Sequence, residues 1–150
     1  MDGKGFGDKN SFYQNLEENS RRLYDLALAK AKEAYAPYSG FQVGAALLCE
    51  DGSVYEGVNI ENASFGAGIC AERTAACCAI ARGKRRFTAM AVAALKEGKQ
   101  ASAPPCGICR QFLGEFGQEL LVIFGKDREH LQRYPLQELL PRSFQLEEKP

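Results

Sequence analysis

The sequence predicts a layered α/β domain whose sheet is at least partly parallel. Two observations support this fold class: apolar runs of strand length occur from residue 41 onwards, and helix-length segments alternate with them. The expected order is β-β-α-β-α-β, and such alternation favours a sheet with helices packed against it. The first helix is expected on one face of the sheet. A chain of 150 residues is typical of one domain, here expected over residues 11–150.

The N-terminal part predicts a flexible tail followed by a helix. Residues 1–10 contain three glycines and mixed charges, with little to bury. Asn10 or Ser11 is expected to cap the helix, and Gln14 completes a capping box with Ser11. Pro37 ends the helix. Its apolar face is formed by Phe12, Leu16, Leu23, Leu26 and Ala27.

The middle of the chain predicts a β-hairpin and then a helix. Two apolar runs, residues 41–49 and 53–59, are joined by a segment that contains Asp-Gly, a strong turn signal. Residues 70–82 have the length and composition of a helix, with Gly83 as its C-cap. The basic run at residues 82–86 is explained by favourable interaction with the negative end of that helix.

The last third predicts two more strands and a second helix of the same kind. Residues 87–95 and 120–124 read as strands, and residues 106–116 as the helix between them, stopped by Gly117. A short helix is expected around residues 135–140.

Composition limits the functions that fit. Lys and Arg total 19, Asp and Glu total 19, and the formal net charge is zero, which disfavours a protein that neutralises nucleic acid or an anionic membrane. No apolar stretch approaches the roughly 18 residues of a membrane helix, and no signal peptide is visible. We therefore expect a cytoplasmic protein whose six cysteines remain reduced and serve metal binding, catalysis or packing.

Three cysteines and one glutamate form the sharpest motif. Cys70 and Glu72 open one predicted helix, and Cys106 and Cys109 open the next. Residues two apart on a helix point about 200° away from each other, so Cys70 and Glu72 converge only on a point beyond the helix N-terminus. Cys106 and Cys109 lie about 60° apart and can reach the same point. Free N–H groups at both helix ends favour thiolates there.

Three thiolates at one point indicate a bound cation, and one Zn²⁺ fits best. Zinc held by three cysteines keeps one coordination position open, as catalytic zinc sites do. The only histidine, His130, lies in a weakly patterned segment. Glu72 is then free to take a proton from a zinc-bound water. Arg73 can offset the negative charge of the thiolates.

Other interpretations of these cysteines remain open. A CxxC pair alone is as often redox-active or structural, and a structural site could recruit a fourth cysteine. For the remaining cysteines, Cys49, Cys77 and Cys78, we expect buried packing positions.

Four segments together resemble the cytidine deaminase family: residues 41–47, 59–64, 70–75 and 105–111. A ligand followed two residues later by Glu, with P-C-x-x-C further on, is the pattern of zinc deaminases. The resemblance covers about residues 36–144. It implies a three-layer α/β/α sandwich with a mixed sheet and helices on both faces. It also implies hydrolysis of cytidine and deoxycytidine to uridine and deoxyuridine in pyrimidine salvage, with Glu72 as proton shuttle.

The resemblance further implies the roles of individual residues. Asn59 and Glu61 would hold the sugar hydroxyls, while Phe41 and the backbone around Ala71 would contact the base. Short family members are homotetramers with shared active sites. Phe65 stands where the family often has Tyr, and Phe144 matches an aromatic residue that closes a site.

Two other functions remain to be weighed. One is deamination of another aminopyrimidine, either a nucleoside antibiotic such as blasticidin S or a cytosine in RNA. The other is a zinc or redox dithiol module without hydrolytic activity. The Asn59 and Glu61 pair favours a free nucleoside, and the zero net charge disfavours a polynucleotide.

Overall fold

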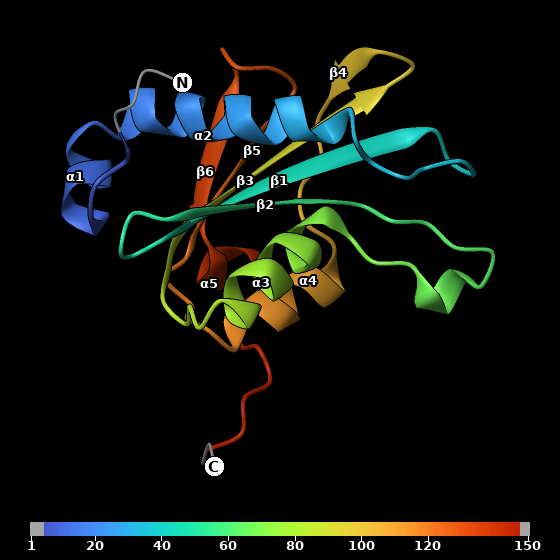
Figure 1. Ribbon diagram of the computed structural model, residues 1–150. Coiled ribbons are helices and arrows are strands. Elements are labelled where there is room, and N and C mark those ends of the chain that lie inside the picture. Colours follow the sequence, from blue (N-terminus) through green and yellow to red (C-terminus); the bar gives the residue numbers. More distant parts are fainter. Residues whose placement is uncertain (1–4, 148–150) are drawn as a thin grey trace.

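The computed structural model describes residues 5–147, in which helices cover both faces of a six-stranded sheet (Figure 1). The strand order is β2-β1-β3-β5-β6, and β4 pairs with β3. The strands are β1 (Phe41–Cys49), β2 (Val54–Val58), β3 (Phe87–Lys96), β4 (Lys99–Ala101), β5 (Leu121–Gly125) and β6 (Leu131–Pro135). The helices are α1 (Lys9–Gln14), α2 (Leu16–Ala31), α3 (Ala71–Ala81), α4 (Gly107–Gly114) and α5 (Leu136–Leu139), with a 3₁₀ turn at Phe65–Ala67.

The three-layer arrangement is confirmed. In Figure 1, α1 and α2 lie on one side of the sheet, and α3, α4 and α5 lie on the other. Along β1, Ala45 and Leu47 join the core beneath α3 and α4, while Ala46 and Leu48 join the core beneath α2. Successive residues of a strand point to opposite faces, so a strand covered on both sides needs an unbroken apolar run. The run at residues 41–49 has this pattern.

The sheet is mixed, as expected. The hairpin of β1 and β2 is antiparallel, and β1 also pairs antiparallel with β3. β3 and β5 run parallel and are connected through α4. This connection brings the start of α4 to the same end of the sheet as the start of α3, so two helix N-termini can face one site.

The N-terminal prediction was wrong in its details. Phe6 is buried, and α1 already begins at Lys9, so residues 5–10 are not the tail that composition indicates. Asp8 caps α1, since its carboxylate accepts a hydrogen bond of 2.8 Å from the Ser11 backbone N–H. The helical backbone is interrupted at Asn15 (φ −126°), which separates α1 from α2. Residues 1–4 of the expected tail lie outside the described residues.

Two further expectations need correction. α2 ends at Ala31, before Pro37, so the proline lies in the loop that leads into β1. Cys49 is buried as expected, but Cys77 and Cys78 are exposed on the outer face of α3. After its first turn α3 has only Ala, Cys and Ile, and such a segment does not reveal from sequence which of its faces meets the sheet.

The basic run after α3 does interact with the helix end. The Arg85 guanidinium donates a hydrogen bond of 2.8 Å to the carbonyl of Ile80 in the last turn of α3. Lys84 Nζ lies 2.5 Å from a carboxylate oxygen of Asp51 in the turn between β1 and β2. These contacts agree with a structural role for the basic run.

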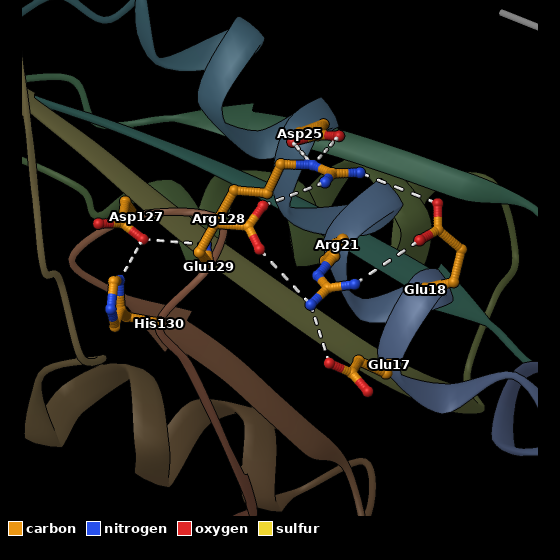
Figure 2. Close-up of polar contacts among 8 residues, drawn as sticks. All are labelled: Glu17, Glu18, Arg21, Asp25, Asp127, Arg128, Glu129 and His130. Atoms are coloured by element: carbon orange, nitrogen blue, oxygen red, sulfur yellow. Dashed lines mark hydrogen bonds and ion pairs between the residues drawn. The ribbon is translucent and has the colours of Figure 1, made fainter.

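A network of charged side chains fastens α2 to the loop between β5 and β6 (Figure 2). Arg21 of α2 pairs with Glu17 at 2.8 Å and with Glu129 of the loop at 3.6 Å. Arg128 of the loop pairs with Asp25 of α2 at 2.9 Å. Networked pairs of this kind hold the helix in register over the sheet more firmly than isolated surface pairs do.

Candidate active site

The site begins with two cysteines that occupy equivalent places at the starts of α3 and α4. Cys70 is the N-cap residue of α3 (φ −77°, ψ 156°), and Cys106 is the N-cap residue of α4 (φ −68°, ψ 168°). In both cases the backbone is extended and the side chain makes no capping hydrogen bond. Cys109 follows in the first turn of α4 and is buried. The positive ends of two helices therefore surround three thiols.

The three sulfur atoms lie close enough together to share one metal ion. The Sγ atoms of Cys70, Cys106 and Cys109 all lie within 4.8 Å of one another, and Cys70 Sγ is 3.6 Å from Cys106 Sγ. Tetrahedral zinc with Zn–S bonds of about 2.3 Å requires sulfur atoms about 3.8 Å apart. The donor set fits Zn²⁺, because soft thiolates select zinc over hard cations, and three of them leave one position for another ligand.

The protein environment favours the ionised thiol at Cys70. Its pKa is lowered to about 5, mainly because the Cys109 thiol hydrogen-bonds to it and also because Arg73 lies alongside. Arg73 Nη2 is 3.7 Å from Cys70 Sγ. The pKa of Cys109 is raised, because its thiol hydrogen-bonds to Cys70 and because its side chain is buried. Metal binding would release the proton that these two sulfur atoms share.

Glu72 lies next to the cysteine cluster in the first turn of α3. Only 3% of the residue is exposed, and carboxylates are rarely buried so deeply in proteins. Burial is the main reason why the pKa of Glu72 is raised above its ordinary value, and the nearby Cys70 thiolate adds to the effect. A buried carboxyl group with a raised pKa beside a metal site is suited to accept and return a proton.

A glycine in the hairpin positions α3 and therefore the site. Gly57 of β2 lies against the helix backbone, where an added Cβ would come within 2.3 Å of Ala75 N and 2.5 Å of Ala71 O. The helix can approach β2 this closely only because residue 57 has no side chain. Thr74 strengthens the contact by donating a hydrogen bond of 2.6 Å from Oγ1 to the Val58 carbonyl.

A cavity of about 920 Å³ opens in front of the cysteine cluster. It is large enough for a small molecule of nucleoside size. Most of the residues expected at the site line this cavity: Phe41, Asn59, Glu61, Phe65, Cys70, Ala71, Glu72, Arg73 and Cys106. Segments far apart in the sequence therefore line one cavity, as expected for segments that together resemble one enzyme family.

Asn59 and Glu61 are held rigidly at the edge of the cavity. Asn59 Oδ1 accepts a hydrogen bond of 2.8 Å from Val43 N, and Asn59 Nδ2 donates one of 2.9 Å to the Phe41 carbonyl. Glu61 accepts hydrogen bonds from the loop before β1. These hydrogen bonds, above all the one from the Ser39 hydroxyl, lower the pKa of the Glu61 carboxyl group. Each side chain retains polar capacity for a ligand.

The two other aromatic residues expected at the site, Phe65 and Phe144, occupy different places. Phe65 lies in the 3₁₀ turn, lines the cavity and is 85% exposed. Phe144 is 73% exposed and does not line the cavity. Its carbonyl accepts a hydrogen bond of 2.8 Å from Gln111 on the outer side of α4. The structure thus does not bring Phe144 to the cavity of its own chain.

The structure adds cavity residues that the sequence did not single out. These include Tyr38, Ser39, Val43, Asn62, Ser102 and Ile108. Ser39 and Gly40 form a recognisable turn signal before β1, which could have drawn attention to this loop. Ser102, in the loop after β4, and Ile108, in the first turn of α4, are exposed, and neither has a local pattern that marks it as a site residue.

Comparisons with known proteins agree with the motif and with the fold. A model of the cytidine and deoxycytidylate deaminase zinc-binding region matches residues 17–125. A cytidine deaminase from Halalkalibacterium halodurans is 46% identical over 127 residues, which cover 84% of this chain and 94% of that protein. A probable cytidine deaminase from Dictyostelium discoideum is 39% identical over 132 residues, or 88% of each chain.

Solved structures of cytidine deaminases are also similar to this chain. The crystal structure of cytidine deaminase from Burkholderia pseudomallei is 42% identical and covers 82% of this chain and 97% of its own, with a TM-score of 0.75. That of cytidine deaminase from Mycobacterium tuberculosis is 40% identical and covers 83% of this chain and 96% of its own, with a TM-score of 0.70.

The zinc-binding region and the thiol cluster together assign one zinc ion to this chain. None of the helices among residues 5–147 has the length and apolar character needed to cross a membrane. The family match spans well over half of the 150 residues and includes Cys70 with α3 and Cys106 and Cys109 with α4. The chain belongs to the cytidine and deoxycytidylate deaminase family.

Proposed function

We propose that this chain hydrolyses cytidine and deoxycytidine to uridine and deoxyuridine, with release of ammonia, in pyrimidine salvage. The observation that carries this proposal is the buried carboxyl group of Glu72 beside three clustered thiols at the base of a nucleoside-sized cavity. The high identity to cytidine deaminases supports the choice of substrate.

In this proposal Cys70, Cys106 and Cys109 hold the zinc ion. Bound there, zinc lowers the pKa of a coordinated water and so supplies a nucleophile at neutral pH. Arg73 limits the negative charge that the three thiolates accumulate, since its guanidinium lies beside Cys70.

Glu72 is the proposed proton carrier. Its carboxylate takes a proton from the attacking water and passes it to N3 of the pyrimidine while oxygen adds at C4. It then takes the remaining proton of the added hydroxyl group as the C4=O bond forms and delivers that proton to the exocyclic amine, which leaves as ammonia when the C4–N bond breaks. Burial raises the pKa of Glu72, so its carboxylate accepts a proton more readily than an exposed glutamate does.

The remaining cavity residues bind and orient the nucleoside. Asn59 and Glu61 hold the sugar hydroxyls, Phe41 forms a wall for the base, and the backbone at Ala71 contacts its polar edge. A neutral base offers few charged handles, so amide and carboxylate groups for the sugar and an aromatic wall suit this substrate.

Neighbouring chains are proposed to complete the cavity in a homotetramer. The exposed rings of Phe65 and Phe144 are available for burial against partner chains. The solution mass of the zinc-loaded protein tests this: four chains are expected, and a monomer would contradict it. We also propose a cytoplasmic location, where reduced thiols remain available to zinc.

The experiment that tests the proposed function follows the loss of cytidine absorbance for the native chain and for Glu72→Gln at equal zinc content. The variant should keep about one zinc ion per chain, because Glu72 is not a ligand. Its turnover should fall by roughly 10²–10⁴-fold, the usual contribution of a positioned acid–base group. Undiminished turnover would refute the mechanism. A zinc-free native protein with a Cys106–Cys109 disulfide would instead favour the redox dithiol module.

A further inference from the structure

The loop that precedes β1 is organised around the carboxylate of Glu61. Oε1 of Glu61 accepts hydrogen bonds of 3.0 Å from the backbone N–H groups of Tyr38 and Ser39. Oε2 accepts a hydrogen bond of 2.5 Å from the hydroxyl of Ser39. An ionised carboxylate offers about four acceptor positions, so the loop occupies three and leaves about one for a ligand.

The Ser39 hydroxyl has its proton directed at Glu61. Its oxygen also accepts a hydrogen bond of 2.9 Å from the backbone N–H of Phe41, the first residue of β1. Since one hydroxyl carries a single proton, that proton is available only to Glu61. Ser39 therefore connects the carboxylate on one side of the cavity with the strand that carries the aromatic ring of Phe41.

Lys96 holds this loop from the far end of the neighbouring strand. It is the last residue of β3 and pairs with Phe41 in the sheet register. Its Nζ donates a hydrogen bond of 2.5 Å to the carbonyl of Ser39. Gly40 adopts a left-handed backbone conformation (φ +66°), which turns the chain sharply between Ser39 and β1.

We propose that Ser39 is a positioning residue for Glu61 and that Lys96 holds Ser39 in place, so that this pair sets the preference for nucleosides with sugar hydroxyls. The inference rests on the proposed function, which assigns the sugar to the Glu61 side of the cavity. A carboxylate only accepts hydrogen bonds, so it rewards a ligand hydroxyl and gains nothing from a sugar that lacks one.

The test compares cytidine with 2′,3′-dideoxycytidine as substrates of the zinc-loaded native chain and of Ser39→Ala. The variant should raise KM for cytidine about tenfold, the loss typical of one charge-assisted hydrogen bond, and change kcat less than about twofold. The kcat/KM for dideoxycytidine should stay near its native value. The preference for the hydroxylated sugar should therefore fall about tenfold.

Three further variants separate positioning from general stability. Ser39→Thr keeps the hydroxyl and should restore the native preference. Lys96→Met should reduce the preference in the same direction but by less. Ser53→Ala is a matched control, because the Ser53 hydroxyl makes a similar 2.5 Å hydrogen bond to Asp51 in a turn that does not line the cavity. It should leave the preference unchanged.

Two outcomes overturn the inference in distinguishable ways. A native chain that deaminates cytidine, together with a Ser39→Ala variant that loses activity equally on both nucleosides or keeps its preference, refutes the role of Ser39 alone. A zinc-loaded native chain that deaminates neither nucleoside refutes the proposed function and this inference with it.

Discussion

At the scale of single residues, the chemistry depends on where each cysteine lies relative to a helix start. Cys70 and Cys106 are N-cap residues with extended backbones, so their thiols project beyond the helices. Cys109 lies three residues after Cys106, in the first turn of α4, and its buried thiol completes the cluster. Cys77 has the same side chain but lies on the exposed face of α3. Among residues 5–147 it belongs to no group of side chains that could hold a metal ion.

This difference between cysteines can be tested directly. Cys109→Ala should lower zinc affinity by more than the 10–100-fold that is typical when an outer-shell partner is lost, because a ligand atom disappears. Cys77→Ala should keep one zinc ion per chain. Metal analysis of both variants after dialysis against a weak chelator measures this. Equal zinc content in the two variants would show that Cys109 is not a ligand.

The sequence was sufficient to find the residues whose spacing reflects helix geometry. Cys70, Glu72, Cys106 and Cys109 were predicted from residue type and spacing; the structure brings the three sulfur atoms within 4.8 Å of one another and buries Glu72. Ser39 was not found, because its role depends on Glu61, which lies 22 residues away, and no local pattern connects the two. Contacts between distant loops exist only once the strands between them have paired.

At the scale of the elements, the hairpin and α3 act as one unit. β2 approaches α3 so closely at Gly57 that no side chain fits between them. Any movement of the hairpin therefore moves the start of α3, which carries Cys70 and Glu72. The elements that hold the site are thus coupled through backbone contact rather than through long side chains.

Gly57→Ala should destabilise the protein strongly. The new methyl group would meet helix backbone, which cannot move aside as a side-chain tip can, so a loss at or above the 1–3 kcal/mol typical of overpacking is expected. Urea unfolding of the zinc-loaded protein measures the loss. Gly66→Ala is the control, because nothing lies within 4 Å of the added Cβ. Similar stability of the two variants would contradict the close packing.

The turn between β1 and β2 should make stability depend on pH. Lys84 hydrogen-bonds to Asp51 and holds the pKa of that carboxyl group well below its ordinary value of 3.8. Because the pKa of this carboxyl group is lower in the folded than in the unfolded state, its ionised form stabilises the fold above about pH 4. This stabilisation is lost as the pH falls further. Asp51→Asn should therefore reduce stability at pH 7, and the difference from the native chain should shrink below pH 4. A difference that is independent of pH, measured by urea unfolding, would contradict this.

Two strands escaped prediction because their sequences lack a core pattern. β4 has three residues and follows β3 through a tight turn at Glu97 and Gly98, both with positive φ. β6 is an edge strand with an exposed centre and Pro135 at its end. Edge strands are specified by the neighbour they pair with, here β5, and much less by their own hydrophobicity. The buried strands β1, β3 and β5 were predicted almost to the residue.

At the scale of the whole molecule, the fold divides its tasks between the two faces of the sheet. The face covered by α1 and α2 carries the second hydrophobic core and the charge network of Figure 2. The opposite face carries the thiol cluster, the buried carboxyl group and the cavity, where α3 and α4 begin. The zero net charge suits a small uncharged substrate rather than a polynucleotide.

The most direct test of the central claim measures zinc content and uridine formation in the same samples while zinc is removed stepwise with a chelator and then restored. If the cysteine cluster holds the metal that drives deamination, the rate of uridine formation from cytidine falls in proportion to the zinc lost and returns when zinc is added back. A zinc-free protein that still converts cytidine to uridine at the native rate would contradict the account.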